Sequence, residues 1–431
     1  MSLVKSPKEI IDEAEASGSA GLLARHGSWE RIEIGKVATI QNGAPFSSTL
    51  FNTRRKGFPI IRIRDVGKNE ISTWFDGEFS VEYVVQFGDL LIGMDGDFRS
   101  SRWLGEPALL NQRVCRLVVT DERVLQAFIE YALPGYLDAI AAETSSITVK
   151  HLSSKSIQQI LLPLPPFAEQ ERIVEILEEQ FSRLDGALAS IKAVRQKSQA
   201  FRRSLLHSAF SGDLTTVDKH LELKKLQDLV LSRSDITDGP FGSNLKSSHY
   251  VSAGPRVVRL ANIGSGVFVD AQAHITSEHF ETLRKHEVVA GDVLVASLGE
   301  DIPRACIAPE SLGEAIVKAD CIRIRPAPNV SSQYLAFALN SPQVRANALA
   351  NIQGVTRPRI NLGALRSTSI PIPDYGEQQR IVTILEQQFS RLDNALEITN
   401  RLEARIASER RSLLHATFSG ELTAQWRETH V

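Results

Sequence analysis

The sequence has few cysteines and no long apolar run. Cys115, Cys306 and Cys321 are its three cysteines in 431 residues, and no C-x-x-C pair occurs. This argues against a disulfide framework and against a cysteine-rich zinc site. There is no uncharged apolar stretch of about 18 residues, and the first residues lack a signal-peptide core. We therefore expect a soluble, cytoplasmic protein.

Sequence signatures of common active sites are also missing. We find no G-x-x-x-x-G-K-[ST] phosphate loop, no G-x-G-x-x-G after a strand and no H-E-x-x-H. The ten histidines do not cluster at the spacing of metal ligands, so we expect no metal and no cofactor in this chain. Lys and Arg number 49 against 51 Asp and Glu, a net charge of −2. A nucleic-acid partner would therefore have to be recognised by local patches.

What the sequence does contain is an internal repeat. Residues 169–215 align without a gap to residues 377–423, and 27 of the 47 positions are identical. Weaker similarity continues upstream, where Gly88–Ile92 resembles Gly291–Val295 at a slightly different offset. The drifting offset indicates insertions and deletions in loops. The predicted layout is a variable domain and a near-invariant helix, repeated once.

We predict five segments. They are an N-terminal extension at 1–25, whose role we cannot assign, a first variable domain at 26–165, a central long helix at 166–215, a second variable domain at 216–372, and a C-terminal long helix and tail at 373–431.

Each variable domain is rich in strand-like segments and has one helix-like stretch, at about 122–142 and about 331–351. This combination predicts an α+β fold. The strand-like segments are Phe58–Ile63, Asp89–Ile92, Cys115–Val119 and Leu161–Leu164 in the first domain, and Arg256–Leu260, Asp292–Ala296, Cys321–Arg325 and Ser369–Ile372 in the second.

Both near-invariant segments are predicted to form long helices with an apolar seam. Apolar residues recur at alternating spacings of three and four residues over about four and a half heptads, which is typical of a coiled coil. Asp374 lies three residues before Glu377 in a capping-box arrangement, and Gly212 and Gly420 lie where left-handed C-terminal caps are expected. The seam residues are Ile173, Leu177, Leu184, Ile191, Leu205, Ile381, Leu385, Leu392, Leu402 and Leu413.

The two helices could pack into two separate domains or against each other. Two matched apolar seams in one chain more simply bury each other, and we favour that arrangement. His207 and His415 occupy equivalent positions near the helix ends, where the helix dipole favours a cation, so we expect them to have a structural role.

The loops in which the variable domains differ carry basic and polar side chains mixed with aromatic ones. Arg and Lys can bind guanine, and Asn can bind adenine. A basic loop is more often plain solvated surface, and both domains are near neutral, which counts against an extensive phosphate-binding surface. The candidate DNA contacts are Arg54, Arg55, Lys56, Arg99, Arg102, Asn244, Lys246, Arg357 and Arg359.

Taken together, these features resemble the specificity subunit of a Type I restriction–modification system. The resemblance consists of two variable domains, each followed by P-[LI]-P-x-x-x-E-Q-x-R-I-V, a heptad helix and S-L-L-H-x-x-F-S-G-x-L-T. Segments Pro163–Thr215 and Pro371–Thr423 carry these motifs, and the resemblance covers about residues 26–431.

The resemblance implies two target-recognition domains, each of which reads half of a bipartite double-stranded DNA sequence. It implies a non-catalytic chain that assembles with two modification (methyltransferase) subunits and with restriction (endonuclease and translocase) subunits. Adenine-N6 methylation with S-adenosylmethionine, and cleavage driven by ATP with Mg²⁺, would then belong to those partners. No membrane partner is implied.

This reading also favours an antiparallel helix pair. Local two-fold axes of duplex DNA are perpendicular to its axis, and an antiparallel pair has a two-fold axis in the same relation to its own helices. We therefore expect two mixed α+β recognition domains joined by two long helices that form an intramolecular antiparallel coiled coil. The 37 residues from 169 to 205 would span roughly 55 Å, which allows at most roughly 16 base pairs between attachment points.

Two other classes of function stay open. One is a protein-interaction scaffold that never touches DNA, which the near-neutral charge favours. The other is an enzyme with an unrecognised active site. Divergence concentrated in basic loops favours the DNA-specificity reading. In addition, Gly420–Trp426 followed by Gly27–Ile32 resembles the internal junction Gly212–Leu226, which predicts that the two ends of the repeat lie close together.

Overall fold

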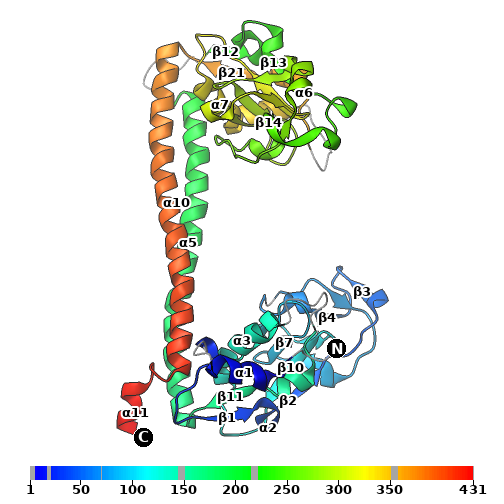
Figure 1. Ribbon diagram of the computed structural model, residues 1–431, viewed down its shortest axis with the longest axis vertical. Coiled ribbons are helices and arrows are strands. Elements are labelled where there is room, and N and C mark those ends of the chain that lie inside the picture. Colours follow the sequence, from blue (N-terminus) through cyan, green and yellow to red (C-terminus); the bar gives the residue numbers. More distant parts are fainter. Residues whose placement is uncertain are drawn as a thin grey trace. The chain divides into compact units, whose positions relative to one another are not determined.

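The chain forms two compact units. The computed structural model describes residues 5–16, 21–68, 70–143, 151–214, 222–350 and 358–430. Unit 1 consists of Met1–Ser190 with Arg401–Val431, and unit 2 of Ile191–Asn400. Each unit combines one variable domain with part of each long helix (Figure 1). A linear division of the sequence could not reveal this sharing of the helices.

The described residues of unit 1 form three sheets. The two-stranded sheet pairs β1 and β11, the four-stranded sheet has the order β2-β10-β7-β8, and the five-stranded sheet has the order β3-β5-β4-β9-β6. The strands are β1 (Glu30–Glu33), β2 (Ala38–Asn42), β3 (Phe51–Asn52), β4 (Phe58–Ile61), β5 (Trp74–Phe75), β6 (Val84–Val85), β7 (Leu90–Gly93), β8 (Ser100–Arg102), β9 (Ala108–Leu110), β10 (Val114–Val119) and β11 (Leu161–Leu164). Helix α1 (Pro7–Ala16) lies in the N-terminal extension, and the helices of the variable domain are α2 (Ile34–Val37), α3 (Gln126–Glu143) and α4 (Ser154–Gln158).

Unit 2 repeats this plan. It has the pair β12-β21 and two four-stranded sheets of order β13-β20-β17-β18 and β15-β14-β19-β16. The strands are β12 (Glu222–Lys225), β13 (Ile236–Asp238), β14 (Tyr250–Val258), β15 (His274–Ile275), β16 (Glu287–Val288), β17 (Val293–Ala296), β18 (Arg304–Ile307), β19 (Ala315–Val317), β20 (Cys321–Ile324) and β21 (Ser369–Ile372). The helices of its variable domain are α6 (Ser277–Thr282), α7 (Ser332–Asn340), α8 (Pro342–Leu349) and α9 (Leu362–Ser367).

The mixed helix-and-strand architecture agrees with the predicted fold class. The single helix predicted at about 331–351 was wrong, because the structure has two helices there, α7 and α8. Ser341 separates them: its side chain accepts a hydrogen bond from the Val344 amide, and Pro342 occupies the first turn of α8. Proline has no backbone N–H to donate, so it interrupts the hydrogen bonds of a helix interior. In the first turn this N–H has no partner within the helix, so proline is well tolerated there.

The two near-invariant segments form the long helices α5 (Phe167–Ser211) and α10 (Tyr375–Phe418), followed by the short helix α11 (Ala424–His430). The Asp374 carboxylate accepts the Glu377 amide at 3.0 Å, as the capping pattern predicted. Gly212 (φ 85°) and Gly420 (φ 80°) both have the predicted left-handed backbone. This conformation suits glycine because it has no Cβ.

Within each unit, α5 and α10 contact each other and run antiparallel. In unit 2, Arg195 donates to the Asn400 side chain at 2.7 Å, and Arg202 pairs with Asp393. In unit 1, Arg410 pairs with Asp185. In unit 2, later residues of α5 therefore contact earlier residues of α10. The same holds in unit 1, where Glu169 contacts Thr423.

The predicted seam matches the buried positions only in part. Ile173, Leu177, Ile381 and Leu385 are buried, but in the cores of the variable domains. Ile191 is also buried. Four of the remaining seam leucines are half-buried: Leu184, Leu205, Leu392 and Leu413.

The exception is Leu402, which is 44% exposed, so its assignment to a buried seam was wrong. Val194 and Phe201 of α5 are also exposed. Their neighbours Arg195 and Arg202 are half-buried and make the polar contacts with α10. Polar contacts of the residues next to these heptad positions thus face α10, and the apolar side chains of Val194 and Phe201 do not. A continuous coiled coil stays a prediction.

Candidate nucleic-acid interface

Three predicted contacts of the first variable domain lie on one exposed turn after β3. Asn52 holds this turn, since its side chain accepts the amides of Arg54 (3.0 Å) and Lys56 (3.1 Å). Arg55 has a left-handed backbone (φ 60°), and its guanidinium lies over the Trp74 ring at 5.5 Å. Lys56 pairs with Asp76 at 2.6 Å. The turn therefore presents cations on a fixed backbone.

Arg99 and Arg102 differ in their exposure and in their carboxylate partners. Arg99 is exposed and pairs with Asp97 at 3.2 Å. Arg102 donates through Nε and Nη2 to both carboxylate oxygens of Glu130 on α3, and this bond raises the pKa of the guanidinium. A bidentate pair with a largely buried carboxylate favours a structural role for Arg102 over DNA contact.

The predicted contacts of the second domain lie in two loops. Asn244 and Lys246 are exposed, and the Asn244 carbonyl accepts a hydrogen bond from His279 at 2.9 Å. Arg359 pairs with Asp320 at 2.7 Å and lies over the Phe241 ring at 5.2 Å. Arg357 lies outside the described residues. The assignment of these residues to DNA contact stays a prediction.

A group of three positions is repeated in both domains, and of its residues only Arg359 was predicted from the sequence as a contact. In the first domain, Met94 donates its amide to the Arg113 carbonyl (3.0 Å) and accepts the Leu152 amide (2.7 Å). In the second, Ser297 donates to the Asp320 carbonyl (2.9 Å) and accepts the Ile360 amide (2.8 Å). Two matching bridges follow, Asp95 with His151 and Leu298 with Arg359.

We call these positions the three-position site. It consists of Asp95, Arg113 and His151 in the first domain and of Leu298, Asp320 and Arg359 in the second. In the first domain, one carboxylate contacts two side chains: Asp95 pairs with Arg113 and contacts His151 Nδ1 at 2.7 Å. Burial alone would raise the pKa of Asp95, but the bonds from His151 and Arg113 outweigh it and lower this pKa.

The repeated E-Q-x-R motif anchors each long helix to its domain through a buried glutamine. Gln170 accepts the Leu125 amide at 2.8 Å and donates to the carbonyls of Arg123 and Pro165, both at 2.9 Å. Gln378 makes the matching set of bonds in unit 2, with the Ser331 amide and with the carbonyls of Asn329 and Pro373. Each glutamine thus ties the start of its helix to the loop before α3 or α7.

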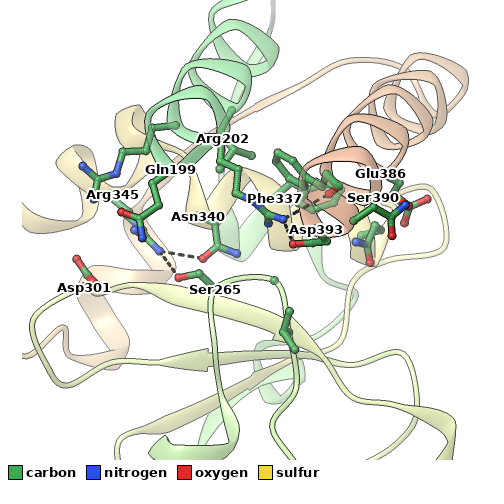
Figure 2. A pocket seen from close by; sticks show the side chains of 17 residues that line it. Gln199, Arg202, Ser265, Asp301, Phe337, Asn340, Arg345, Glu386, Ser390 and Asp393 are labelled. Atoms are coloured by element: carbon green, nitrogen blue, oxygen red, sulfur yellow. Dashed lines mark hydrogen bonds and ion pairs between the residues drawn. The ribbon is translucent and has the colours of Figure 1, made fainter. Parts of the chain in front are cut away.

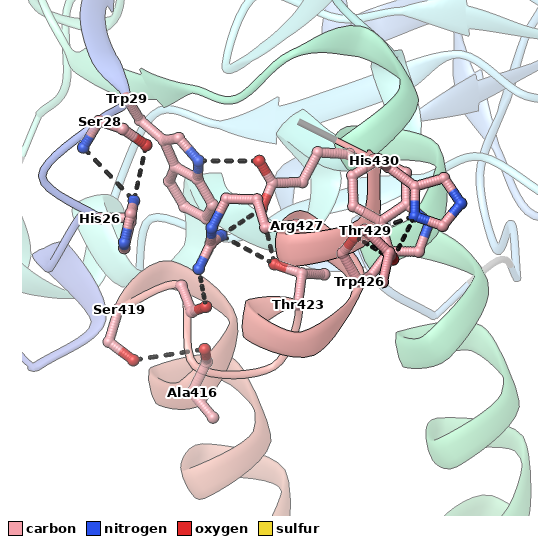
Figure 3. Close-up of polar contacts among 12 residues, drawn as sticks. His26, Ser28, Trp29, Ala416, Ser419, Thr423, Trp426, Arg427, Thr429 and His430 are labelled. Atoms are coloured by element: carbon pink, nitrogen blue, oxygen red, sulfur yellow. Dashed lines mark hydrogen bonds and ion pairs between the residues drawn. The ribbon is translucent and has the colours of Figure 1, made fainter.

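The neighbouring Glu169 joins the two ends of the repeat in unit 1. Trp29 from one end lies beside Thr423 and Arg427 from the other (Figure 3). The fully buried Glu169 carboxylate accepts Trp29 Nε1 at 3.0 Å and Thr423 Oγ1 at 2.7 Å, and it pairs with Arg427. Arg427 also lies over the Trp29 ring. Segment 26–32 therefore lies beside segment 420–427, as the similarity of the junctions predicted.

A second repeated cluster links the long helices to the domain helices. In unit 2, the Arg202 guanidinium lies 4.8 Å from the centre of the Phe389 ring, which packs edge-on against Phe337. Unit 1 has the equivalent cluster of Arg410 over Phe181, with Tyr131 in the place of Phe337.

In unit 2, a cavity of about 700 Å³ opens beside the cluster of Arg202, Phe389 and Phe337 (Figure 2). Arg202, Arg203, Arg345, Asp301, Glu386 and Asp393 are among its lining residues, so its charges balance.

Among the described residues, no group of three or more His, Cys, Asp or Glu side chains could hold a metal ion. In the same part of the chain, every helix is too short or too polar to cross a membrane. His207 and His415 are both exposed at their helix ends. Their predicted structural role has no side-chain contact to support it in the described structure, and it stays a prediction.

Comparison with known proteins identifies the family. The chain matches the Type I restriction modification DNA specificity domain at residues 27–192 and again at 249–407. The chain belongs to this family. It is 36% identical over 443 residues to the Type I restriction enzyme EcoBI specificity subunit of Escherichia coli, covering 99% of this chain and 92% of that protein.

More distant relatives agree. The MjaVIII specificity subunit of Methanocaldococcus jannaschii is 20% identical, with 91% of this chain and 93% of that protein covered. A solved structure titled as the basis of complex assembly and conformational transition of the type I R-M system matches with a TM-score of 0.67 at 17% identity. It covers 92% of this chain and 99% of that chain, and it supports the fold. The predicted resemblance, fold class and function as a DNA specificity subunit are thereby confirmed.

Proposed function

We propose that each variable domain reads one half of a bipartite duplex DNA target and that α5 and α10 set the length of the unread spacer. Two modification subunits and the restriction subunits would assemble on this chain and supply methylation and cleavage. S-adenosylmethionine, ATP and Mg²⁺ would be bound by those subunits, so this chain itself would be non-catalytic and would act in the cytoplasm.

The observation that carries this proposal is a duplicated scaffold with unlike loops. The sheets, the buried glutamines Gln170 and Gln378, and the arginine–phenylalanine clusters occur in both repeats. The exposed loops differ in sequence and in their ion pairs. A shared scaffold with different exposed groups is what two readers of different half-sites require, because base edges are read by exposed side chains.

Exchange of residues 26–165 for the first domain of another family member tests this modularity. Methylated adenines would be mapped in cells that carry the complete system. We expect one half-site to change while the other half-site and the spacer stay as they were. Simultaneous loss of both half-sites would contradict independent reading.

We propose further that the partners bind the exposed positions that are identical in the two long helices. A residue that is kept in both copies because of packing should be buried, yet several identical pairs are exposed. They are Arg183 with Arg391, Arg203 with Arg411, and His207 with His415. Their recurrence gives two equivalent surfaces, which fits two copies of the same modification subunit.

Charge reversal tests this surface. The double variant Arg183→Glu with Arg391→Glu should lose co-purification with the modification subunit. Lys192→Glu is the matched control, since Lys192 is an exposed cation of α5 whose counterpart is Asn400. Equal co-purification of the double variant and the control would contradict the docking proposal, while DNA specificity itself would be unaffected by that result.

A further inference from the structure

The three-position site occupies the same backbone positions in both domains but carries different side chains. The matching hydrogen bonds of Met94 and Ser297 fix this equivalence independently of sequence alignment. The side chains at the three positions change, from Asp95 to Leu298, from Arg113 to Asp320 and from His151 to Arg359. The scaffold is therefore constant where the exposed chemistry varies.

In both domains, a shielded carboxylate holds an exposed arginine. The side chain of Asp95 is 19% exposed and that of its partner Arg113 is 55% exposed. The corresponding values are 21% for Asp320 and 51% for Arg359. The carboxylate thus comes from a different position in each domain, yet the result is the same: one arginine held by an aspartate and open to solvent.

The contacts leave part of each guanidinium available. Arg113 contacts Asp95 through Nη1. Arg359 forms an ion pair with Asp320 through Nε, but the geometry of this pair is not that of a hydrogen bond. Neither arginine has another ion pair or a hydrogen bond from a second guanidinium nitrogen among the described residues. The Phe241 ring under Arg359 restricts it further. A held guanidinium with free N–H groups is suited to two parallel bonds with a flat acceptor edge.

We propose that Arg113 and Arg359 are specificity-determining residues, each of which reads a guanine in the half-site of its own domain. Guanine is the base that presents two acceptors, O6 and N7, on the major-groove edge, and a guanidinium fits both. Asp95 and Asp320 act as positioning residues, and His151 adds a second polar side chain to the first site only. This inference rests on the proposed half-site reading.

The test uses the complete modification complex, assembled with the full chain. The bipartite target is first mapped as methylated adenines, and duplexes with every single base change in that target are then compared for methylation. Arg359→Ala should lower discrimination at one G·C pair of one half-site by about 10- to 100-fold, with the other half-site unchanged. Arg113→Ala should have the reciprocal effect on the other half-site.

Three variants separate base reading from other roles. Arg359→Lys keeps the charge but not the planar two-pronged geometry, so it should weaken the guanine preference while it keeps overall affinity. Asp320→Asn should weaken that preference without abolishing it. Arg123→Ala is the matched control, because Arg123 is 63% exposed and pairs with Asp121 at 2.7 Å elsewhere on the first domain. It should leave every base preference unchanged.

Two results would overturn the inference. One is an equal loss of affinity for all duplexes with Arg359→Ala, which would mean a phosphate contact. The other is unchanged discrimination in variants whose thermal unfolding shows that they are folded. In both cases the proposed function would still hold if the wild-type complex methylates a bipartite target. Failure of the wild-type complex to methylate a bipartite target would instead refute the proposed function.

Discussion

At the scale of single residues, the buried side chains define what each unit tolerates. Gln378 makes all its bonds to backbone groups, and the amide of Ser331 has no other acceptor among the contacts described. Replacement by alanine would leave buried polar groups without partners. We expect Gln378→Ala to lower the free energy of unfolding of unit 2 by about 2–3 kcal/mol.

Urea unfolding checks this expectation, with Gln379→Ala as the control because Gln379 is exposed beside it. The same midpoint for both variants would contradict the role given to Gln378. In addition, hydrogen exchange should become faster at the start of α7 in the Gln378 variant alone.

The Glu169 carboxylate is fully buried, and Arg427 is its cationic partner. Loss of one partner of a buried ion pair costs about 3–5 kcal/mol, because a buried charge is left uncompensated. We therefore expect Arg427→Met to destabilise unit 1 by about that amount. Adding Glu169→Gln should restore part of the loss, and calorimetry would show the recovery. A double variant less stable than Arg427→Met alone would contradict this account.

The three thiols are free and buried, and burial raises the pKa of Cys115, Cys306 and Cys321 to about 12 each. The thiolate is the reactive form, so the native protein at pH 8 should hardly react with a thiol reagent such as Ellman's reagent. The unfolded protein should react at all three positions. A rapidly reacting thiol in the native chain would show that one of these sites opens.

Some residue roles could be predicted from the sequence and others could not. The repeated motif indicated that Glu169 and Gln170 matter, but their partners Trp29 and Leu125 are distant in sequence. Arg359 was predicted as a contact because it lies in a basic loop. Arg113, Asp95 and His151 were missed because the fold, and not the sequence pattern, brings them together. An alignment of the two repeats that lets the offset shift from 203 to 208 residues could have matched these three positions with Leu298, Asp320 and Arg359.

At the scale of elements, the long helices were predicted well because heptad spacing, caps and glycines agree. The burial of individual seam positions was predicted less well. Arg195 and Arg202 contact α10 through polar bonds, and this leaves Val194 and Phe201 exposed. Periodicity identifies the apolar residues of a helix, but it does not reveal that a neighbouring arginine faces the other helix in place of one of them.

The helices provide an element-scale prediction about DNA spacing. Insertion of seven residues after Val194 and after Leu402, which are equivalent positions of α5 and α10, lengthens both helices by about 10 Å. The methylated target should then have a spacer longer by up to about 3 base pairs. Insertion into one helix alone should instead disrupt pairing and activity. An unchanged spacer in the double insertion would contradict the role of the helices as a ruler.

At the scale of the whole molecule, the chain is a duplicated reader whose chemistry is proposed to come from its partners. The central claim is that this chain alone sets a bipartite DNA target. The most direct measurement is genome-wide mapping of methylated adenines in cells with the complete system, with and without a functional copy of this chain. We predict methylation at two different half-sites separated by a fixed, unread spacer, and its disappearance without the chain. A contiguous target, or the same target without this chain, would contradict the account.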